Sequence, residues 1–158
     1  MPQIKSLSVP YVAGLSGGNL EFVTELLMDR GASGFVEQVN WLREFPYKPI
    51  TEFNVLRSDL SLFVRFNVRG NLLKAVYSTD QSPVYKDSCV EFFCKLPESA
   101  CYFNFEFNCI GTCAASNRRA RKVDVTPLNE HQMQLIRRLP SIGRRPFNEM
   151  QGIFEWNL

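Results

Sequence analysis

The stretch CYFNFEFNC, residues 101–109, decides the fold class because its residues alternate strictly between two faces. Phenylalanine and cysteine occupy one face. The other face carries Tyr102, Asn104, Glu106 and Asn108. Alternation with a period of two is typical of a β-strand with one apolar and one polar face. The sequence therefore predicts a strand over this stretch.

Further strands are predicted on both sides of it. They cover residues 60–68, 72–77, 88–96, 119–125 and 152–158. Gly70-Asn71 predicts a turn between the first two strands, and PESA (97–100) predicts a hairpin into the strand 101–109. Helical spacing of apolar residues predicts a short helix over 19–29, and residues 129–138 are predicted to form a helix or a turn. Several short strands separated by turns are typical of an all-β sandwich with a few short helices.

Length and composition narrow the class of protein. A chain of 158 residues predicts one domain spanning 1–158. The net charge of +2 argues against a nucleic-acid binder, and no apolar run approaches the roughly 18 residues of a membrane-spanning helix. The five cysteines are odd in number and form no CxxC pair, which favours reduced thiols. With no signal peptide evident, we expect a cytoplasmic protein, or a periplasmic or secreted one if a leader was removed.

The polar face of the central strand is the first indication of function. The hairpin brings Glu91 beside Asn104 and Glu106, because neighbouring strands lie about 5 Å apart. Amides and carboxylates match sugar hydroxyl groups, which both donate and accept hydrogen bonds. Tyr85 and Trp41 are candidate rings for stacking on a sugar. We expect the row to face outward, either as a sugar or polyol site or as plain solvated surface.

Several motifs in a fixed order indicate a family. PVYKDSCVEFF (83–93) and YFNFEFNCIGT (102–112), together with NWLREFPYKP (40–49) and LSLFVRFNV (60–68), resemble the family 9 carbohydrate-binding modules. In particular, they resemble family-9-like proteins of glycan-degrading gut bacteria. The resemblance covers residues 35–158. It implies a jelly-roll-like antiparallel β-sandwich without catalytic activity and a role in polysaccharide utilisation.

The resemblance also assigns roles to single residues. Tyr85 takes the place of the first stacking ring, which is Trp in the sugar-binding members. Glu91 matches the family's carboxylate, and Asn104 and Glu106 fall where the family places hydroxyl-binding groups. The resemblance therefore implies a ligand-binding set of Tyr85, Glu91, Asn104 and Glu106, and the ligand expected is a mono- or oligosaccharide.

The resemblance further implies structural features around this site. Asp87 matches a family aspartate with a structural role, and Asn108 is a second structural candidate. Closing strands are expected after Leu158, so the domain is predicted to be truncated at its C-terminus. The sheet edge left exposed would then allow self-association.

Two other functions stay open beside non-catalytic carbohydrate binding. One is a structural β-sandwich module that has lost its ligand. The other is a glycoside hydrolase that uses Glu91 and Glu106 as its pair of carboxylates.

Charged side chains outside the central hairpin suggest further ligands. Calcium is a candidate cofactor because Asp80, Asp87 and Asp124 supply oxygen ligands, although no EF-hand spacing occurs. Four basic residues within 118–122 predict either a solvated loop or a contact for phosphate or acidic glycans.

Overall fold

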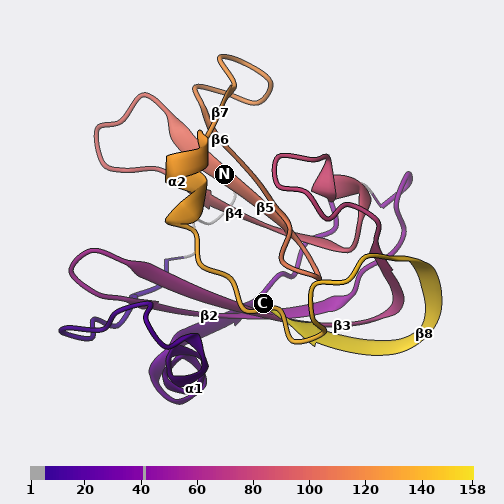
Figure 1. The fold of residues 1–158 in the computed structure, drawn as a ribbon, viewed down its shortest axis with the longest axis horizontal. Coiled ribbons are helices and arrows are strands. Elements are labelled where there is room, and N and C mark those ends of the chain that lie inside the picture. The colour runs from indigo at the N-terminus through magenta and orange to yellow at the C-terminus, as the bar shows by residue number, and fades with distance from the viewer. Residues whose placement is uncertain (1–5, 41) are drawn as a thin grey trace. The chain divides into compact units, whose positions relative to one another are not determined.

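The computed structural model describes residues 6–40 and 42–158. The elements in chain order are α1 (Leu20–Arg30), β1 (Ala32–Phe35), β2 (Ile50–Arg57), β3 (Leu62–Ala75), the 3₁₀ turn η1 (Val84–Lys86), β4 (Cys89–Cys94), β5 (Tyr102–Asn108), β6 (Cys113–Arg118), β7 (Thr126–Pro127), α2 (Glu130–Gln134) and β8 (Phe147–Asn157). The strands form two four-stranded sheets, ordered β1-β2-β3-β8 and β4-β5-β6-β7 (Figure 1). Two largely antiparallel sheets with few short helices confirm the predicted all-β sandwich class.

The chain divides into two compact units, residues 1–69 and 70–158, which we describe separately. The single domain expected from the length stays a prediction. Among the described residues, no helix is both long and apolar enough to cross a membrane. The outer strands of the two sheets are β1 and β8 in one and β4 and β7 in the other. Self-association through such an edge also stays a prediction.

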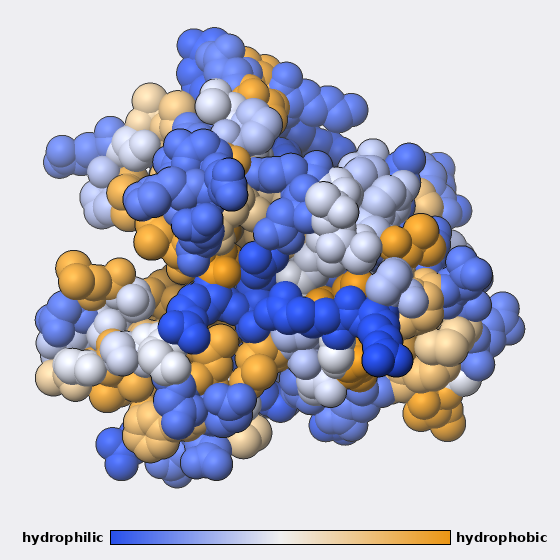
Figure 2. Space-filling model, viewed as in Figure 1, coloured by the Kyte–Doolittle hydropathy of each residue, from blue (hydrophilic) through white to orange (hydrophobic). Residues whose placement is uncertain are grey.

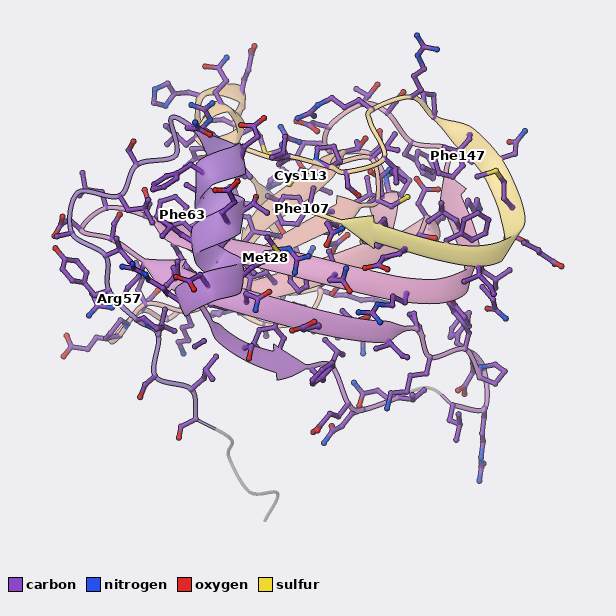
Figure 3. All side chains as sticks on the ribbon, turned by 90° about the horizontal axis from the view of Figure 1, so that it is seen from below. Met28, Arg57, Phe63, Phe107, Cys113 and Phe147 are labelled. Atoms are coloured by element: carbon purple, nitrogen blue, oxygen red, sulfur yellow. The ribbon has the colours of Figure 1, made fainter. Side chains whose placement is uncertain are left out.

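The first unit is built around helix α1. Asn19 caps the helix by accepting a hydrogen bond from the Phe22 N–H at 2.9 Å, which satisfies one of the unpaired groups of the first turn. The core of this unit contains Val23, Leu27, Leu56 and Phe63. The helix predicted over 19–29 is confirmed, because α1 covers Leu20–Arg30. Phe63 of β3 lies beside α1 (Figure 3), so the helix covers one face of its sheet.

The predicted turn at Gly70-Asn71 is wrong. Both residues lie inside the single 14-residue strand β3, which replaces the separate strands expected over 60–68 and 72–77. A turn of this kind requires positive φ, but neither Gly70 nor Asn71 has positive φ, and β3, which lies between β2 and β8 in its sheet, continues through both residues. Cross-strand pairing therefore overrides a weak local turn signal, and its antiparallel partner β2 was not predicted.

The second sheet contains the hairpin that the sequence predicts. β4 and β5 pair antiparallel and are joined by residues 95–101, which include the predicted 97–100 turn, and the strands expected over 88–96 and 101–109 are confirmed. The strand expected over 119–125 is wrong, because β6 occupies Cys113–Arg118 instead. Residues after β6 form a tight turn in which Lys122 and Asp124 have positive φ, a conformation incompatible with a regular strand.

The phenylalanine face of β5 packs under α2. Phe105 and Phe107 contact a cluster that includes Cys113 and the buried Met133 of α2, and Figure 3 shows Phe107 and Cys113 on neighbouring strands. A capping box of Asn129 and Gln132 begins this helix. The helix predicted over 129–138 is present but covers only Glu130–Gln134, while the C-terminal strand is longer than expected, Phe147–Asn157.

An ion pair ties the segment after α2 to the second sheet. Arg138 binds Asp80 with two parallel hydrogen bonds, Nη1 to Oδ1 at 2.7 Å and Nη2 to Oδ2 at 2.9 Å. Arg138 also donates to the Gly111 carbonyl at 3.0 Å, and Asp80 accepts from the Cys113 N–H at 3.0 Å. Such paired geometry is stronger than a single surface contact. Burial by itself would raise the pKa of Asp80, but the hydrogen bonds from Arg138 and Cys113 lower it overall.

This ion pair predicts how the Arg138→Gln substitution depends on pH. Because the pKa of Asp80 is lowered by folding, its stabilisation is complete above the ordinary value of 3.8 and is lost as the pH falls through the lower folded value. We expect Arg138→Gln to reduce the free energy of unfolding by about 1–2 kcal/mol at pH 7, and this difference to shrink below pH 3.8. Urea titrations of both proteins from pH 7 to pH 3 measure it. A difference that grows toward acid pH would contradict this role.

Candidate functional site

Polar side chains gather on one face of β4, β5 and β6. We call them the polar cluster, which consists of Glu91, Asn104, Glu106, Ser116 and Arg118. Glu91 pairs across the strands with Glu106, and Asn104 pairs with Ser116. Directly paired residues point to the same side of a sheet, and residues two apart on a strand do so too. The register therefore places all five side chains on one face.

Glu106 is the centre of the cluster's hydrogen bonds. Its Oε1 accepts from Asn104 Nδ2 at 2.6 Å and from Arg118 Nη2 at 3.3 Å. Arg118 Nε in turn donates to Ser116 Oγ at 2.7 Å. Both bonds to Glu106 reach the same oxygen, so within the described part of the chain its Oε2 is left without a donor. The cluster thus partly offsets the Glu106 charge and keeps one of its oxygens available as an acceptor.

The polar row of β5 is turned inward, and the expectation that it faces outward is wrong. Asn104 is 1% exposed, Glu106 is 9% exposed and Asn108 is 0% exposed. The alternate residues Phe103, Phe105 and Phe107 are only half-buried. Alternation reveals that a strand has two chemically different faces, but it does not reveal which faces other elements cover.

Glu91 lies at the exposed side of the cluster. Although the residue as a whole is exposed, partial burial of its carboxyl group raises its pKa, and the facing carboxylate of Glu106 raises it further. Arg118 and Arg121 lower the pKa of Glu91, but by less. The two carboxylates therefore form a like-charged pair that the neighbouring arginines offset only in part.

Aromatic rings flank the polar cluster. The rings of Phe93 and Tyr102 lie 6.0 Å apart between centroids, with an angle of 48° between their planes. Phe93 is exposed and pairs across the strands with Asn104, so this ring pair adjoins the polar cluster on the same face. Tyr85, the ring predicted from sequence, is 60% exposed on η1, which contacts β4 and β5. Trp41 lies outside the described residues.

Comparison with known proteins decides the family. The family model described as carbohydrate-binding family 9 matches residues 21–158. The chain belongs to carbohydrate-binding family 9. It also resembles a crystal structure of a protein from Bacteroides uniformis proposed to bind carbohydrate, with 29% identity and a TM-score of 0.86. The match covers 97% of this chain and 70% of that chain. No curated protein is significantly similar to this chain.

The resemblance to family 9 modules that the sequence motifs indicate is therefore confirmed. Membership of this family and the carbohydrate-binding neighbour support a sugar ligand.

Asp87 and Asn108 form a second polar group, at the C-terminal end of η1. Asp87 accepts hydrogen bonds from the N–H groups of Val76 and Tyr77, each at 3.0 Å, and from Asn108 Nδ2 at 3.0 Å. Asn108 Nδ2 also donates to the Tyr77 carbonyl at 2.7 Å, and its Oδ1 accepts from the Thr112 N–H at 2.9 Å. Every polar atom of the Asn108 side chain is thus used to join three segments of the family 9 chain.

The aspartates named as calcium ligands are engaged elsewhere. Asp80 binds Arg138, Asp87 accepts the hydrogen bonds just described, and Asp124 pairs with Arg119 at 2.8 Å. Throughout residues 6–40 and 42–158, no group of three or more His, Cys, Asp or Glu side chains is arranged to hold a metal ion. Calcium binding therefore stays a prediction, and the described residues form no acidic cluster that would support it.

All five cysteines are free thiols. Cys109 and Cys113 are buried, and burial raises the pKa of each thiol to about 12. Burial also raises the pKa of Cys89, which is further raised by the nearby carboxylates of Glu91 and Glu106. Thiols with such high pKa values stay protonated at neutral pH and are weak nucleophiles.

Three residues of the polar cluster and its adjoining rings are not among the site residues that the sequence predicts. Arg118 was considered only as part of a basic loop, although it lies on β6 and binds Glu106. Ser116 and Phe93 were not considered as site residues. The alternation of β4 places Phe93 on the same face as Glu91, so the sequence pattern could have indicated Phe93. Ser116 and Arg118 could be placed only once the position of β6 was known.

Proposed function

We propose that this family 9 chain binds a mono- or oligosaccharide without catalysing its conversion, and that the polar cluster and the adjoining rings form the binding surface. The observation that supports this most directly is the common face of β4, β5 and β6. On that face a carboxylate pair, an amide and an arginine adjoin the exposed ring of Phe93.

The proposed contacts follow from the chemistry of each group. Carboxylates at Glu91 and Glu106 accept hydrogen bonds from sugar hydroxyl groups, and the amide of Asn104 extends this array. A sugar also has an apolar C–H face, which packs against an aromatic ring. Tyr85 and Phe93 are both exposed and supply such rings. Binding of moderate strength is expected, since water competes for each exposed hydrogen bond.

Replacing Glu91 with glutamine tests the proposed function. We expect the dissociation constant for a bound sugar to rise by about tenfold or more, because a charge-assisted hydrogen bond contributes about 1.5–3 kcal/mol. Isothermal titration against glucose, galactose, mannose, xylose and their β-linked disaccharides measures the effect. Glu149→Gln is the matched control, because Glu149 is an exposed carboxylate on β8. Equal affinity of both variants would remove Glu91 from the site.

One observation favours a structural module without ligand as the second candidate. Asn104 and Glu106 are buried, and Glu106 is already paired with Arg118. If this reading holds, no sugar of the panel gives heat with the wild-type protein. The hydrolase alternative rests on the facing carboxylates of Glu91 and Glu106. Release of reducing sugar from the disaccharides that disappears in Glu106→Gln would favour the hydrolase.

A further inference from the structure

Gln81, in the loop before η1, has a backbone conformation that residues other than glycine rarely adopt, with φ at +63°. Such a conformation is unfavourable and persists where surrounding contacts hold it in place. The Gln81 N–H donates to the Cys113 carbonyl at 2.8 Å, and the side-chain amide bonds to Ala115 and Leu128. Both the nitrogen and the oxygen of this side chain are therefore engaged, although the residue as a whole is exposed.

The side-chain amide of Gln81 replaces a backbone hydrogen bond at the edge of β6. Next to the end of β7, the Leu128 N–H donates to the Ala115 carbonyl at 2.9 Å. In an antiparallel pair the reciprocal bond runs from the Ala115 N–H to the Leu128 carbonyl. Gln81 bridges these two groups instead, because its Oε1 accepts from Ala115 at 3.0 Å and its Nε2 donates to Leu128 at 2.8 Å. Gln81 thus fastens the loop to two segments of the second unit.

The other end of η1 is fastened as well. Asp87 accepts the hydrogen bonds described above, and the Ser88 N–H donates to the Lys74 carbonyl at 2.9 Å. The Ser88 hydroxyl in turn accepts from the Lys74 N–H at 3.0 Å. Between the two fastened ends, Val84 is fully buried and Tyr85 is 60% exposed. The turn is therefore held on both sides, and the aromatic ring that it presents to solvent is Tyr85.

We infer that Gln81 is a positioning residue, which fixes the ring of Tyr85 for stacking against a sugar. The inference rests on the proposed function and adds a residue that acts through the turn. Ser82 and Pro83 separate Gln81 from η1, and the fixed φ of proline leaves little backbone freedom to absorb a displacement. A ring on a held turn loses little further freedom on binding. A ring on a loosened turn must first be ordered, which weakens binding by about three- to tenfold.

Hydrogen exchange tests the positioning without any ligand. Gln81→Met removes the side-chain hydrogen bonds, and Gln81→Gly removes them while also relieving the positive φ. The N–H groups of Lys86 and Asp87 are bonded within the turn. We expect both to exchange about tenfold or more faster in each variant, measured by NMR. Gln151→Met, at an exposed glutamine on β8, is the matched control. Exchange that is unchanged in both Gln81 variants would overturn the inference.

Isothermal titration then connects the turn with the ligand. For each sugar of the panel that binds the wild-type protein, we expect Gln81→Met to raise the dissociation constant about three- to tenfold. Gln151→Met should leave it unchanged. The effect of Gln81→Met should disappear when Tyr85→Leu is already present, because the turn then carries no ring to position. A loss of equal size with and without Tyr85→Leu would show that Gln81 does not act through this ring.

The outcomes separate this inference from the proposed function. If no sugar of the panel binds the wild-type protein, the proposed function fails and the role of Gln81 in sugar binding fails with it. If a sugar binds equally well to the wild-type protein and to both Gln81 variants, only the inference fails. Loss of the near-UV circular dichroism of the folded protein in both variants would assign Gln81 to the stability of the whole unit, which also overturns the positioning role.

Discussion

Replacing Asn108 with alanine is expected to lower the free energy of unfolding by about 3 kcal/mol or more, because each buried hydrogen-bonding group left unsatisfied costs about 1–3 kcal/mol. Asn108 is fully buried and joins Tyr77, Asp87 and Thr112 through three hydrogen bonds. Its removal leaves the Tyr77 carbonyl and the Thr112 N–H without these partners. It also takes a hydrogen-bond donor from the carboxylate of Asp87.

The matched control for this substitution is Asn148→Ala. Asn148 lies exposed on β8, so its truncation should change the free energy of unfolding by less than about 0.5 kcal/mol. Urea unfolding at pH 7 measures both variants. Equal stability of the two proteins would show that the contacts of Asn108 contribute nothing. A large loss of stability would identify this asparagine, which the strand pattern groups with Asn104 and Glu106, as a structural residue.

Replacing Ile110 with alanine is expected to lower the free energy of unfolding by about 2–5 kcal/mol, the range for truncating a buried Ile or Leu. Ile110 is 1% exposed in the connection between β5 and β6, next to Gly111, whose φ is +78°. The substitution removes apolar contacts and leaves a cavity that the tight turn cannot close by moving, because Gly111 already lies against Pro140.

Ile153 provides the comparison within the same unit. This residue is 100% exposed on β8, and Ile153→Ala should alter stability by less than about 0.5 kcal/mol. Thermal and urea unfolding of the two variants give the difference directly. A change of similar size in both would mean that burial does not control the contribution of isoleucine here.

Exposed apolar residues such as Ile153 are not unusual in this protein. On the side of the molecule drawn in Figure 2, hydrophobic residues are interspersed among hydrophilic ones.

The alternation of apolar and polar residues was sufficient to predict the central hairpin. In β4 and β5 local propensity and side-chain alternation agree, and the short connection between them favours antiparallel pairing of the two strands. The motifs around Tyr85 and Glu91 were specific enough to indicate the family. The predicted element bounds are wrong where a local sequence signal disagrees with strand pairing. Gly70-Asn71 resembles a turn, yet strand β3 continues through both residues.

The position of β6 could not be predicted for a related reason. Its sequence, CAASNR, has little β-propensity, and it forms a strand because β5 offers it a full set of hydrogen-bonding partners. The following residues have stronger strand propensity but form the turn. The predicted strand begins six residues after the true start of β6, so Arg118 falls outside it. The sequence therefore does not place Arg118 beside Glu106, although the two side chains form an ion pair.

The sequence by itself determined the all-β class, the hairpin, the family and the chemical contents of the polar row, because each is encoded in residues close together along the chain. Tertiary structure alone decided that this row lies inside, that Arg118 joins it, and that the Asn104 oxygen has no hydrogen-bond partner among the described residues. The physical reason is that the burial of a strand face and the pairing of a side chain depend on which distant segments cover it, and a local pattern carries no record of those segments.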